Sequence, residues 1–111
     1  IVRMYNSAFK STNVESLIKD NVINDHACHK YVIVCNSRNL LNTKLHKDGI
    51  RCKIHYEQPL HEISCFRKHS ELDMLSKASI LSRKVLSLPL FPELSNDEVN
   101  YVIARVLFHA S

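Results

Sequence analysis

Two spacings of apolar residues alternate along the chain, and this alternation most constrains its fold. Three short strand-like runs lie at residues 31–35, 50–56 and 85–88. Before, between and after them, apolar residues recur every three or four positions, which is typical of amphipathic helices. The resulting order of helix, strand, helix, strand, helix, strand and helix predicts a small α/β or α+β layer. We expect a short three-stranded sheet covered by helices.

Few helix-breaking residues divide these segments, because the 111-residue chain contains one Gly and three Pro. The first helix is predicted over residues 1–18, with a break near residues 11–13. Ser37 is placed to cap a second helix through its hydroxyl, and Gly49 to end that helix in a left-handed conformation. The apolar stripe of this helix is predicted to be Leu40, Leu41 and Leu45.

The last two helices differ in how clearly the sequence marks them. Residues 70–84 are helical in composition, and their apolar side is predicted to be Leu72, Leu75, Ala78 and Leu81. Ser95 and Glu98 have the spacing of a capping box, which begins a helix. Apolar residues then recur at i, i+3, i+4, i+7 and i+8, as Val99, Val102, Ile103, Val106 and Leu107.

The three strand-like runs differ in predicted burial. Residues 31–35 are apolar throughout and rich in β-branched residues, which predicts a strand buried on both faces. Residues 50–56 alternate apolar with basic residues, which predicts a half-buried strand with the basic residues on its wetter face. Residues 85–88 form a third strand that Pro89 stops, and the polar residues 21–29 are predicted to be a loop.

Length and composition predict a single domain over residues 1–111. Aromatic residues make up 7% of the chain, so we expect mainly aliphatic packing. No run approaches the roughly 18 apolar residues of a membrane span. The net charge of +4 is scattered rather than gathered on one nucleic-acid-binding face. We therefore expect no membrane or nucleic-acid partner. Because the chain lacks a starting Met and enters a helix at once, we also expect it to be a fragment of a longer protein.

The cysteines and most histidines are assigned no chemistry. No C-x-x-C pair occurs among Cys28, Cys35, Cys52 and Cys65. Reduced thiols in a cytoplasmic protein are the simplest interpretation, and a disulfide framework is the weaker alternative. The His-Ala-Cys-His run at residues 26–29 lacks a second ligand pair, so no metal site is expected. Solvated side chains are predicted for His46, His69 and His109.

A candidate binding site follows the second strand. His55 closes its polar face, Tyr56 follows, and residues 57–59 break the strand with a proline. Binding groups commonly lie on loops held by a rigid scaffold. An imidazole and a phenol here can donate hydrogen bonds to phosphate or sugar oxygens. Residue types alone favour the plainer alternative of a surface histidine beside a partly buried tyrosine.

No catalytic residue is predicted within the chain. No serine or cysteine stands in a nucleophile elbow, and a single glycine cannot build a phosphate-binding loop. Glu71 and Asp73 lie two positions apart and face different ways on a helix, so they are a poor acid–base pair.

The motifs taken together resemble the C-terminal segment of the DegT/DnrJ/StrS family of sugar-nucleotide aminotransferases. The most informative parts are the His-Tyr-x-x-Pro-Leu-His stretch at residues 55–61 and the Val-Leu-Ser-Leu-Pro-Leu run at residues 85–90. The resemblance covers nearly the whole chain in the family's order, at residues 3–8, 29–33, 38–47, 49–50, 55–61, 80–90 and 97–108.

This resemblance implies a fold-type-I enzyme that depends on pyridoxal 5'-phosphate (PLP). Such a homodimer transfers an amino group, usually from glutamate, to a keto-sugar nucleotide for amino-sugar or surface-polysaccharide biosynthesis. The C-terminal small domain lies over the active site and packs against the large domain of the same chain. The cofactor lysine would lie upstream of Ile1. We therefore expect PLP in the parent protein only, and no catalysis by these 111 residues alone.

The resemblance also assigns the site residues. His55 and Tyr56 match positions that approach the substrate, and His61 is a third substrate-binding candidate that could instead support the loop. Two departures stand out: Glu57 replaces a common proline, and Ser79 occupies a place where the family often has glutamate. These departures leave the substrate open. They also keep an alternative, a non-catalytic α/β interaction or regulatory module derived from the same fold.

Overall fold

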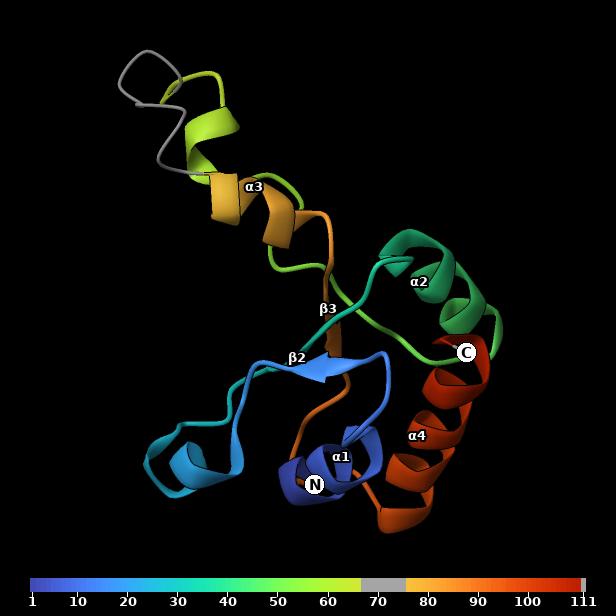
Figure 1. The fold of residues 1–111 in the computed structure, drawn as a ribbon. Helices are drawn as coiled ribbons and strands as arrows, with labels where there is room; N and C mark the ends of the chain where they lie inside the picture. Colours follow the sequence, from blue (N-terminus) through green and yellow to red (C-terminus); the bar gives the residue numbers. More distant parts are fainter. Residues whose placement is uncertain (67–75, 111) are drawn as a thin grey trace.

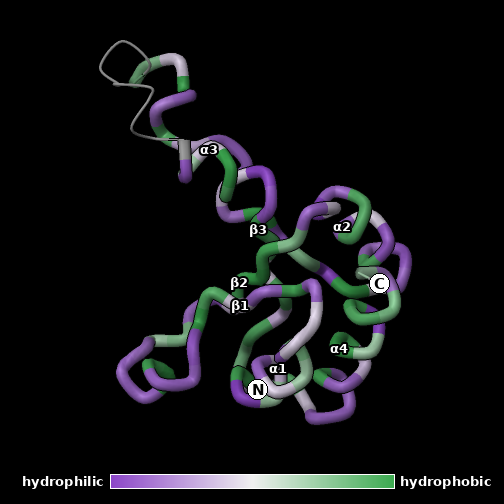
Figure 2. Tube along the Cα trace, viewed as in Figure 1, coloured by the Kyte–Doolittle hydropathy of each residue, from purple (hydrophilic) through white to green (hydrophobic). Residues whose placement is uncertain are grey.

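A three-stranded antiparallel sheet lies at the centre of the computed structural model, which describes residues 1–66 and 76–110 (Figure 1). The strands are β1 (Glu15–Ser16), β2 (Tyr31–Val34) and β3 (Val85–Leu88), and β2 pairs with both of the others. Figure 2 shows hydrophobic residues concentrated where β2 and β3 cross the centre. The predicted three-stranded sheet is confirmed, although one of its three strands is not the one that the sequence predicts.

Helices cover the sheet unevenly. Figure 1 shows α1, α2 and α4 gathered beside β2 and β3, whereas α3 extends away from them. Both α1 and α2 pack against α4. None of the helices within the described residues is long and apolar enough to cross a bilayer. The helical elements are α1 (Val2–Phe9), the 3-10 helix η1 (Asp20–Asp25), α2 (Arg38–Lys47), the 3-10 helix η2 (Leu60–Glu62), α3 (Ser76–Ser82) and α4 (Asn96–Ala110).

The prediction of one helix over residues 1–18 is wrong in its second half. The chain turns after Phe9, whose carbonyl accepts a hydrogen bond from the Thr12 hydroxyl at 2.8 Å. It then pairs with β2 as an extended strand. Val14 and Ile18 are buried. Positions four apart can share one face of a helix and also one face of a strand, so their spacing does not distinguish the two.

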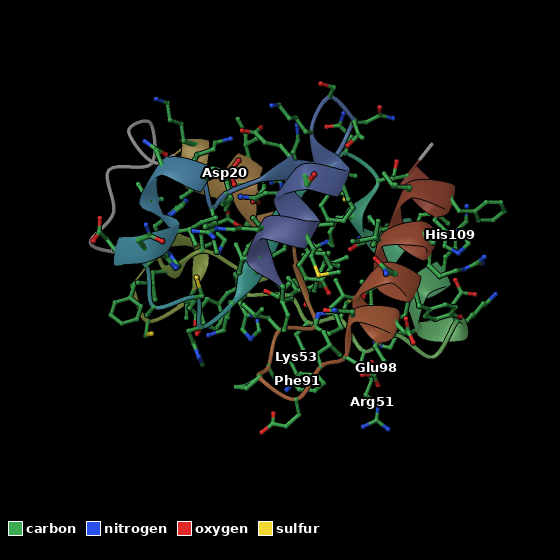
Figure 3. All side chains as sticks on the ribbon, turned by 90° about the horizontal axis from the view of Figure 1, so that it is seen from below. Asp20, Arg51, Lys53, Phe91, Glu98 and His109 are labelled. Carbon is green, nitrogen blue, oxygen red and sulfur yellow. The ribbon has the colours of Figure 1, made fainter. Side chains whose placement is uncertain are left out.

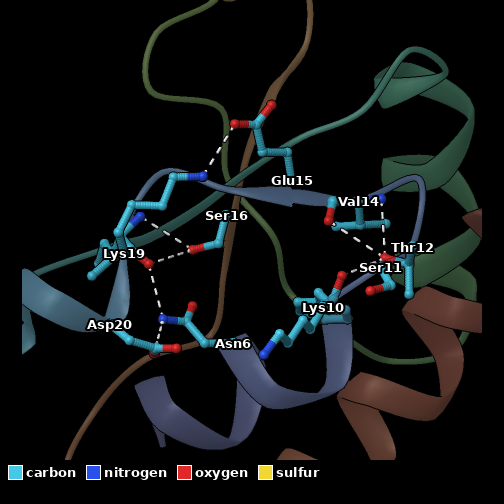
Figure 4. A pocket seen from close by; sticks show the side chains of 11 residues that line it. Asn6, Lys10, Ser11, Thr12, Val14, Glu15, Ser16, Lys19 and Asp20 are labelled. Atoms are coloured by element: carbon cyan, nitrogen blue, oxygen red, sulfur yellow. Dashed lines mark hydrogen bonds and ion pairs between the residues drawn. The ribbon is translucent and has the colours of Figure 1, made fainter.

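The Asn6 side chain fixes the path that follows α1. Its amide nitrogen donates to the Ile18 carbonyl at 2.9 Å and to the Asp20 carboxylate at 2.7 Å (Figure 4). Its amide oxygen accepts a hydrogen bond from the Tyr31 hydroxyl at 2.7 Å. One polar residue of α1 therefore holds both the exit of β1 and the start of β2.

A full strand over residues 50–56 is also wrong. Only Lys53 forms a β-bridge, with Ser87 of β3. The predicted alternation is nevertheless present, because Cys52 is buried while Arg51 and Lys53 are exposed. Figure 3 shows Arg51 extending away from the body of the molecule. The segment lies beside β3, and its backbone hydrogen-bonds to the sheet only at Lys53.

The second helix begins and ends where the sequence predicts, with Ser37 at its N-cap position, but it lacks the predicted capping hydrogen bond. Gly49 has φ of 80°, as predicted for a residue that ends a helix. The Ser37 hydroxyl makes no capping hydrogen bond within the described part of the chain, so its predicted role is wrong. Leu41 and Leu45 are buried, but Leu40 is 55% exposed and does not belong to the apolar stripe.

The described part of the third helix is more exposed than predicted. Helix α3 covers Ser76–Ser82, within the predicted residues 70–84. Ala78 and Leu81, predicted to form part of a buried side, are both exposed. The remaining positions of that side lie outside the described residues, namely Leu72 and Leu75.

The capping box before α4 is confirmed. The Glu98 carboxylate accepts a hydrogen bond from the Ser95 backbone N–H at 2.9 Å, and the Glu98 N–H donates to the Ser95 hydroxyl at 3.3 Å. The Ser95 hydroxyl also donates to this carboxylate at 2.8 Å, and the two hydrogen bonds that the carboxylate accepts lower the pKa of Glu98. The apolar face is buried as predicted, with Val99, Val102 and Val106 in the core and Ile103 and Leu107 packed against it.

The core contains an aromatic cluster that the low aromatic content did not suggest. The Tyr5 and Tyr31 rings lie 4.7 Å apart, and the Tyr5 and Phe9 rings stack 5.9 Å apart. The Tyr5 hydroxyl donates to the Pro89 carbonyl at 2.9 Å. Burial raises the pKa of both tyrosine hydroxyls. The cluster attaches α1 to β2 and to the residues that follow β3.

An ion-pair network joins the end of α2 to α4. The Asp48 carboxylate lies 2.7 Å from Nε of Arg105 and 2.7 Å from Nε2 of His109. The predicted solvation of His109 is therefore wrong, because its side chain is only 10% exposed and is held by Asp48. The two partners lie 61 positions apart in sequence, so no local pattern reveals the contact.

The Asp48 network gives stability a specific acid dependence. Hydrogen bonds from Arg105 and then His109 lower the pKa of Asp48. A lowered carboxyl pKa contributes stability above the unfolded-state value of about 3.9, and this contribution is lost as the pH falls through the folded-state value. We expect the difference in free energy of unfolding between the wild type and Asp48→Asn to shrink between about pH 4 and pH 2. Urea titrations at each pH measure it.

The matched control for this experiment is Glu93→Gln, which removes an exposed carboxylate with no ion pair among the described residues. It should keep the acid dependence of the wild type. A constant difference between Asp48→Asn and the wild type across that pH range would contradict the assignment.

Candidate functional site

His55 and Tyr56 lie together just beyond the bridge between Lys53 and β3. Nδ1 of His55 is 2.9 Å from the hydroxyl oxygen of Ser87 on β3, which holds the half-buried imidazole against the sheet. The Tyr56 ring meets that imidazole edge-on at 5.5 Å, and Tyr56 is 72% exposed. The peptide bond between these two residues is cis. The pair therefore consists of an imidazole anchored by Ser87 and a solvent-exposed phenol.

The pair lines an open, mainly apolar pocket of about 450 Å³ between the segment around η2, helix α3 and the start of β3. This volume lies within the range of roughly 300–1,000 Å³ that is usual for small-molecule sites. We call it the His55 pocket, and its lining includes His55, Tyr56, Pro59, Leu60, Leu81 and Val85. Apolar walls with a few polar groups are typical of sites that bind organic ligands.

Burial and the positive charges around His55 favour the neutral form of its imidazole. Burial is the main cause of its lowered pKa, and the positive charges of Lys30 and Lys53 and the neighbouring His29 lower the pKa further. Neither lysine forms an ion pair with a carboxylate in residues 1–66 and 76–110. The site therefore combines an imidazole that favours its neutral form with two lysines that have no ion pair among the described residues.

His61 lies deeper than the other two predicted site residues. It is 8% exposed, and its Nε2 is 2.9 Å from the Ser79 hydroxyl oxygen. The Ser79 hydroxyl donates to the Glu62 carboxylate at 2.7 Å, so it accepts a hydrogen bond from His61. These contacts attach η2 to α3 and favour loop support by His61. Direct substrate contact by this residue stays a prediction.

Ser79 explains one departure from the family pattern. Where the family often has a glutamate, the serine hydroxyl lies between His61 and the carboxylate of Glu62. A carboxylate is therefore present in this cluster, but it comes from η2 rather than from α3. The position of Glu57 is exposed, beside Tyr56.

Ser87 is the site residue that sequence reasoning missed. Its contact with His55 spans 32 positions, so no local motif contains both. One signal was present: Ser87 is the polar residue of the otherwise apolar run 85–88, and every residue of that strand is buried. Buried hydroxyls have hydrogen-bond partners as a rule, which predicts that such a serine contacts another polar group.

The His55 pocket does not by itself provide the lysine amine that anchors PLP. PLP enzymes anchor their cofactor on a lysine amine, and no lysine lines the His55 pocket. Lys30 and Lys53 lie near His55 but outside that lining. The described residues also contain no group of three or more His, Cys, Asp and Glu side chains that could hold a metal ion.

Residues 1–107 match the DegT/DnrJ/EryC1/StrS aminotransferase family. The chain belongs to this family. The match extends over nearly all of the 111 residues, and it confirms the resemblance drawn from the motifs. Family members are PLP-dependent, and the relatives described next include one enzyme named as an aminotransferase of a sugar nucleotide.

Two curated relatives show how similar the chain is to other members. It is 36% identical over 74 residues to a UDP-N-acetyl-3-dehydro-alpha-D-glucosamine 3-aminotransferase of Acidithiobacillus ferrooxidans, covering 67% of this chain and 20% of that protein. It is 33% identical over 85 residues to a pleiotropic regulatory protein of Geobacillus stearothermophilus, covering 73% of this chain and 22% of that protein. The matched part is about a fifth of each relative's length.

A solved structure confirms the fold class. The chain superposes on DesV of S. venezuelae with a TM-score of 0.87 and 23% identity, covering 99% of this chain and 30% of DesV. The small mixed arrangement of helices and a three-stranded sheet is therefore also found in one part of DesV.

Proposed function

We propose that these 111 residues are the C-terminal small domain of a PLP-dependent aminotransferase that acts on a keto-sugar nucleotide. In this role the chain packs against the large domain of a homodimeric enzyme and helps to close the substrate site. His55 and Tyr56 bind and orient the sugar nucleotide, and His61 supports the loop that carries them. No residue of the described chain is assigned proton transfer.

The observation that carries this proposal is the pairing of His55 and Tyr56 at the mouth of an apolar pocket. The imidazole is anchored through Ser87, while the phenol is 72% exposed and available to a ligand. A sugar ring offers hydroxyl groups to such donors and apolar C–H faces to the pocket walls. The chain's match to a sugar aminotransferase family supports this class of ligand.

Lys30 and Lys53 suit the charged part of that ligand. The diphosphate of a sugar nucleotide is strongly anionic, and two lysines near His55, which form no ion pair within residues 1–66 and 76–110, would attract it. Glu57 adds one opposing charge on the exposed loop next to Tyr56. The excess of positive charge near His55 therefore favours a nucleotide-linked sugar over an uncharged one.

The proposal is tested on the longer protein encoded by the natural reading frame upstream of Ile1. We expect that protein to bind PLP, seen by its visible absorbance, and to form 2-oxoglutarate from glutamate when a keto-sugar nucleotide is added. UDP-N-acetyl-3-dehydro-glucosamine is the first substrate to try, because a relative is named for it. The 111-residue chain should be inactive in the same assay.

A reading frame that begins near Ile1 would contradict the proposal, as would a PLP-binding protein that aminates no keto-sugar nucleotide. The first outcome would favour a second candidate, a non-catalytic regulatory module of the same fold. One observation favours that candidate: two relatives are named a pleiotropic regulatory protein and a sensory transduction protein. Binding of a sugar nucleotide without turnover would be its expected property.

A further inference from the structure

The geometry points to Ser87 as a positioning residue that fixes the proton of His55 on Nε2. His55 thereby offers a neutral N–H donor to an acceptor oxygen of the sugar nucleotide. This inference rests on the proposed function for the identity of the ligand, but the position of the proton does not depend on it. Ser87 itself need not touch the substrate.

Ser87 is held rigidly enough to orient another side chain. Its backbone N–H donates to the Lys53 carbonyl at 2.7 Å, and its carbonyl accepts from the Lys53 N–H at 3.1 Å. On its other side it pairs with Val32 of β2. Ser87 is only 6% exposed. The same residue therefore binds both the backbone at Lys53 and the side chain of His55, two positions later.

The hydroxyl of Ser87 decides where the imidazole proton lies. A serine hydroxyl carries one hydrogen, and the only partner of the Ser87 hydroxyl among the described residues is Nδ1 of His55. If Nδ1 carried the proton, the buried Ser87 hydrogen would have no acceptor there, which is unfavourable. The hydroxyl therefore donates to Nδ1, and a neutral imidazole then carries its proton on Nε2.

Nε2 is left available to a ligand. It has no hydrogen-bond partner within residues 1–66 and 76–110, and it is not sealed from solvent. The His55 ring lines the pocket beside Tyr56. Burial and the nearby lysines lower the pKa of His55 and so favour the neutral form. A neutral Nε2–H donor suits a hydroxyl, keto or phosphate oxygen of the substrate.

The proton position is measured on the 111-residue chain by long-range proton–nitrogen NMR, which separates the two imidazole tautomers. The wild type should show His55 protonated on Nε2 at neutral pH. Ser87→Ala should shift the tautomer balance toward Nδ1, and Ser87→Thr, which keeps a hydroxyl, should restore it. Ser87→Val has the shape of threonine without the hydroxyl, so it should behave like alanine. Ser16→Ala, in β1, is the control that leaves His55 unchanged.

The amide spectrum shows whether each variant keeps its fold, and the threonine and valine pair keeps the test decisive if alanine does not fold. His55 protonated on Nδ1 in the wild type would overturn the inference. So would equal tautomer balances in the threonine and valine variants. Neither result depends on any substrate.

The ligand part is tested separately in the longer enzyme. There Ser87→Val should raise KM for the sugar nucleotide roughly threefold to tenfold relative to Ser87→Thr, with kcat changed much less. Equal KM values in these two variants, together with the expected NMR result, would overturn the ligand part alone. An enzyme without any aminotransferase activity would instead count against the proposed function.

Discussion

Leu86→Ala is expected to lower the free energy of unfolding by about 2–5 kcal/mol, the usual cost of removing a large buried aliphatic side chain. Leu86 is 0% exposed and lies in β3, where it faces the core beside β2. Natural domains of this size have total stabilities of about 5–15 kcal/mol. The variant should therefore unfold at a much lower urea concentration than the wild type.

Leu81→Ala is the matched control for this measurement. The same atoms are removed, but from a side chain that is 41% exposed in α3. Its effect should stay within about 0.5 kcal/mol, as for most surface substitutions. Similar urea midpoints for the two variants would show that β3 does not bury Leu86 as described. They would also indicate that Leu81 belongs to a buried apolar side of α3, as the sequence predicts.

Tyr56→Ala should have the largest effect on function. In the longer enzyme we expect kcat/KM for the keto-sugar nucleotide to fall roughly tenfold to a hundredfold, mainly through KM, because a hydrogen bond and a contact surface are lost together. Stability should change little, since the side chain is 72% exposed. Steady-state kinetics and thermal unfolding separate these two effects.

Tyr101→Ala provides the comparison, because Tyr101 is also an exposed tyrosine, with 49% of its surface accessible. It lies on α4, where its hydroxyl donates a hydrogen bond to the Asp48 carbonyl. It should change kcat/KM by no more than about twofold. If both tyrosine variants lose the same activity, Tyr56 has no particular role in substrate binding, and the assignment of this loop as a binding edge fails.

Elements marked by local signals were predictable from the sequence. The capping box of α4 and the glycine that ends α2 each depend on residues a few positions apart, and both are confirmed. Their energetic causes, side-chain hydrogen bonds to backbone groups and tolerance of positive φ, act within one turn of the chain. The pattern alone was therefore sufficient for these ends.

Strand identity was not predictable in the same way. Residues 50–56 alternate well but form backbone hydrogen bonds with the sheet only at Lys53, while the third strand of the sheet is the two-residue segment Glu15–Ser16. A strand exists only where a partner offers hydrogen bonds, and the choice of partner is a long-range property. Alternation identifies which side chains are buried, as Cys52 and Arg51 show, without identifying the partner.

The site, too, has a part that local sequence signals predict and a part that depends on long-range contacts. The position of His55 and Tyr56 at the end of an extended segment followed from local residue types and the family resemblance. The contacts that organise the site did not, because Ser87 meets His55 across 32 positions and Ser79 meets His61 across 18. Substrate contact by these histidines stays a prediction that the kinetic and NMR measurements address.

The sheet also determines how the chain can associate with copies of itself. One edge strand, β1, is only two residues long, and Glu15 within it forms an ion pair with Lys19. On the opposite edge, both backbone hydrogen-bonding groups of Ser87 are already bonded to Lys53. Short, charged or occupied edges oppose the strand-to-strand stacking that leads to fibrils. Precipitation of concentrated samples should therefore respond to changes in exposed apolar side chains more than to changes at the edge strands.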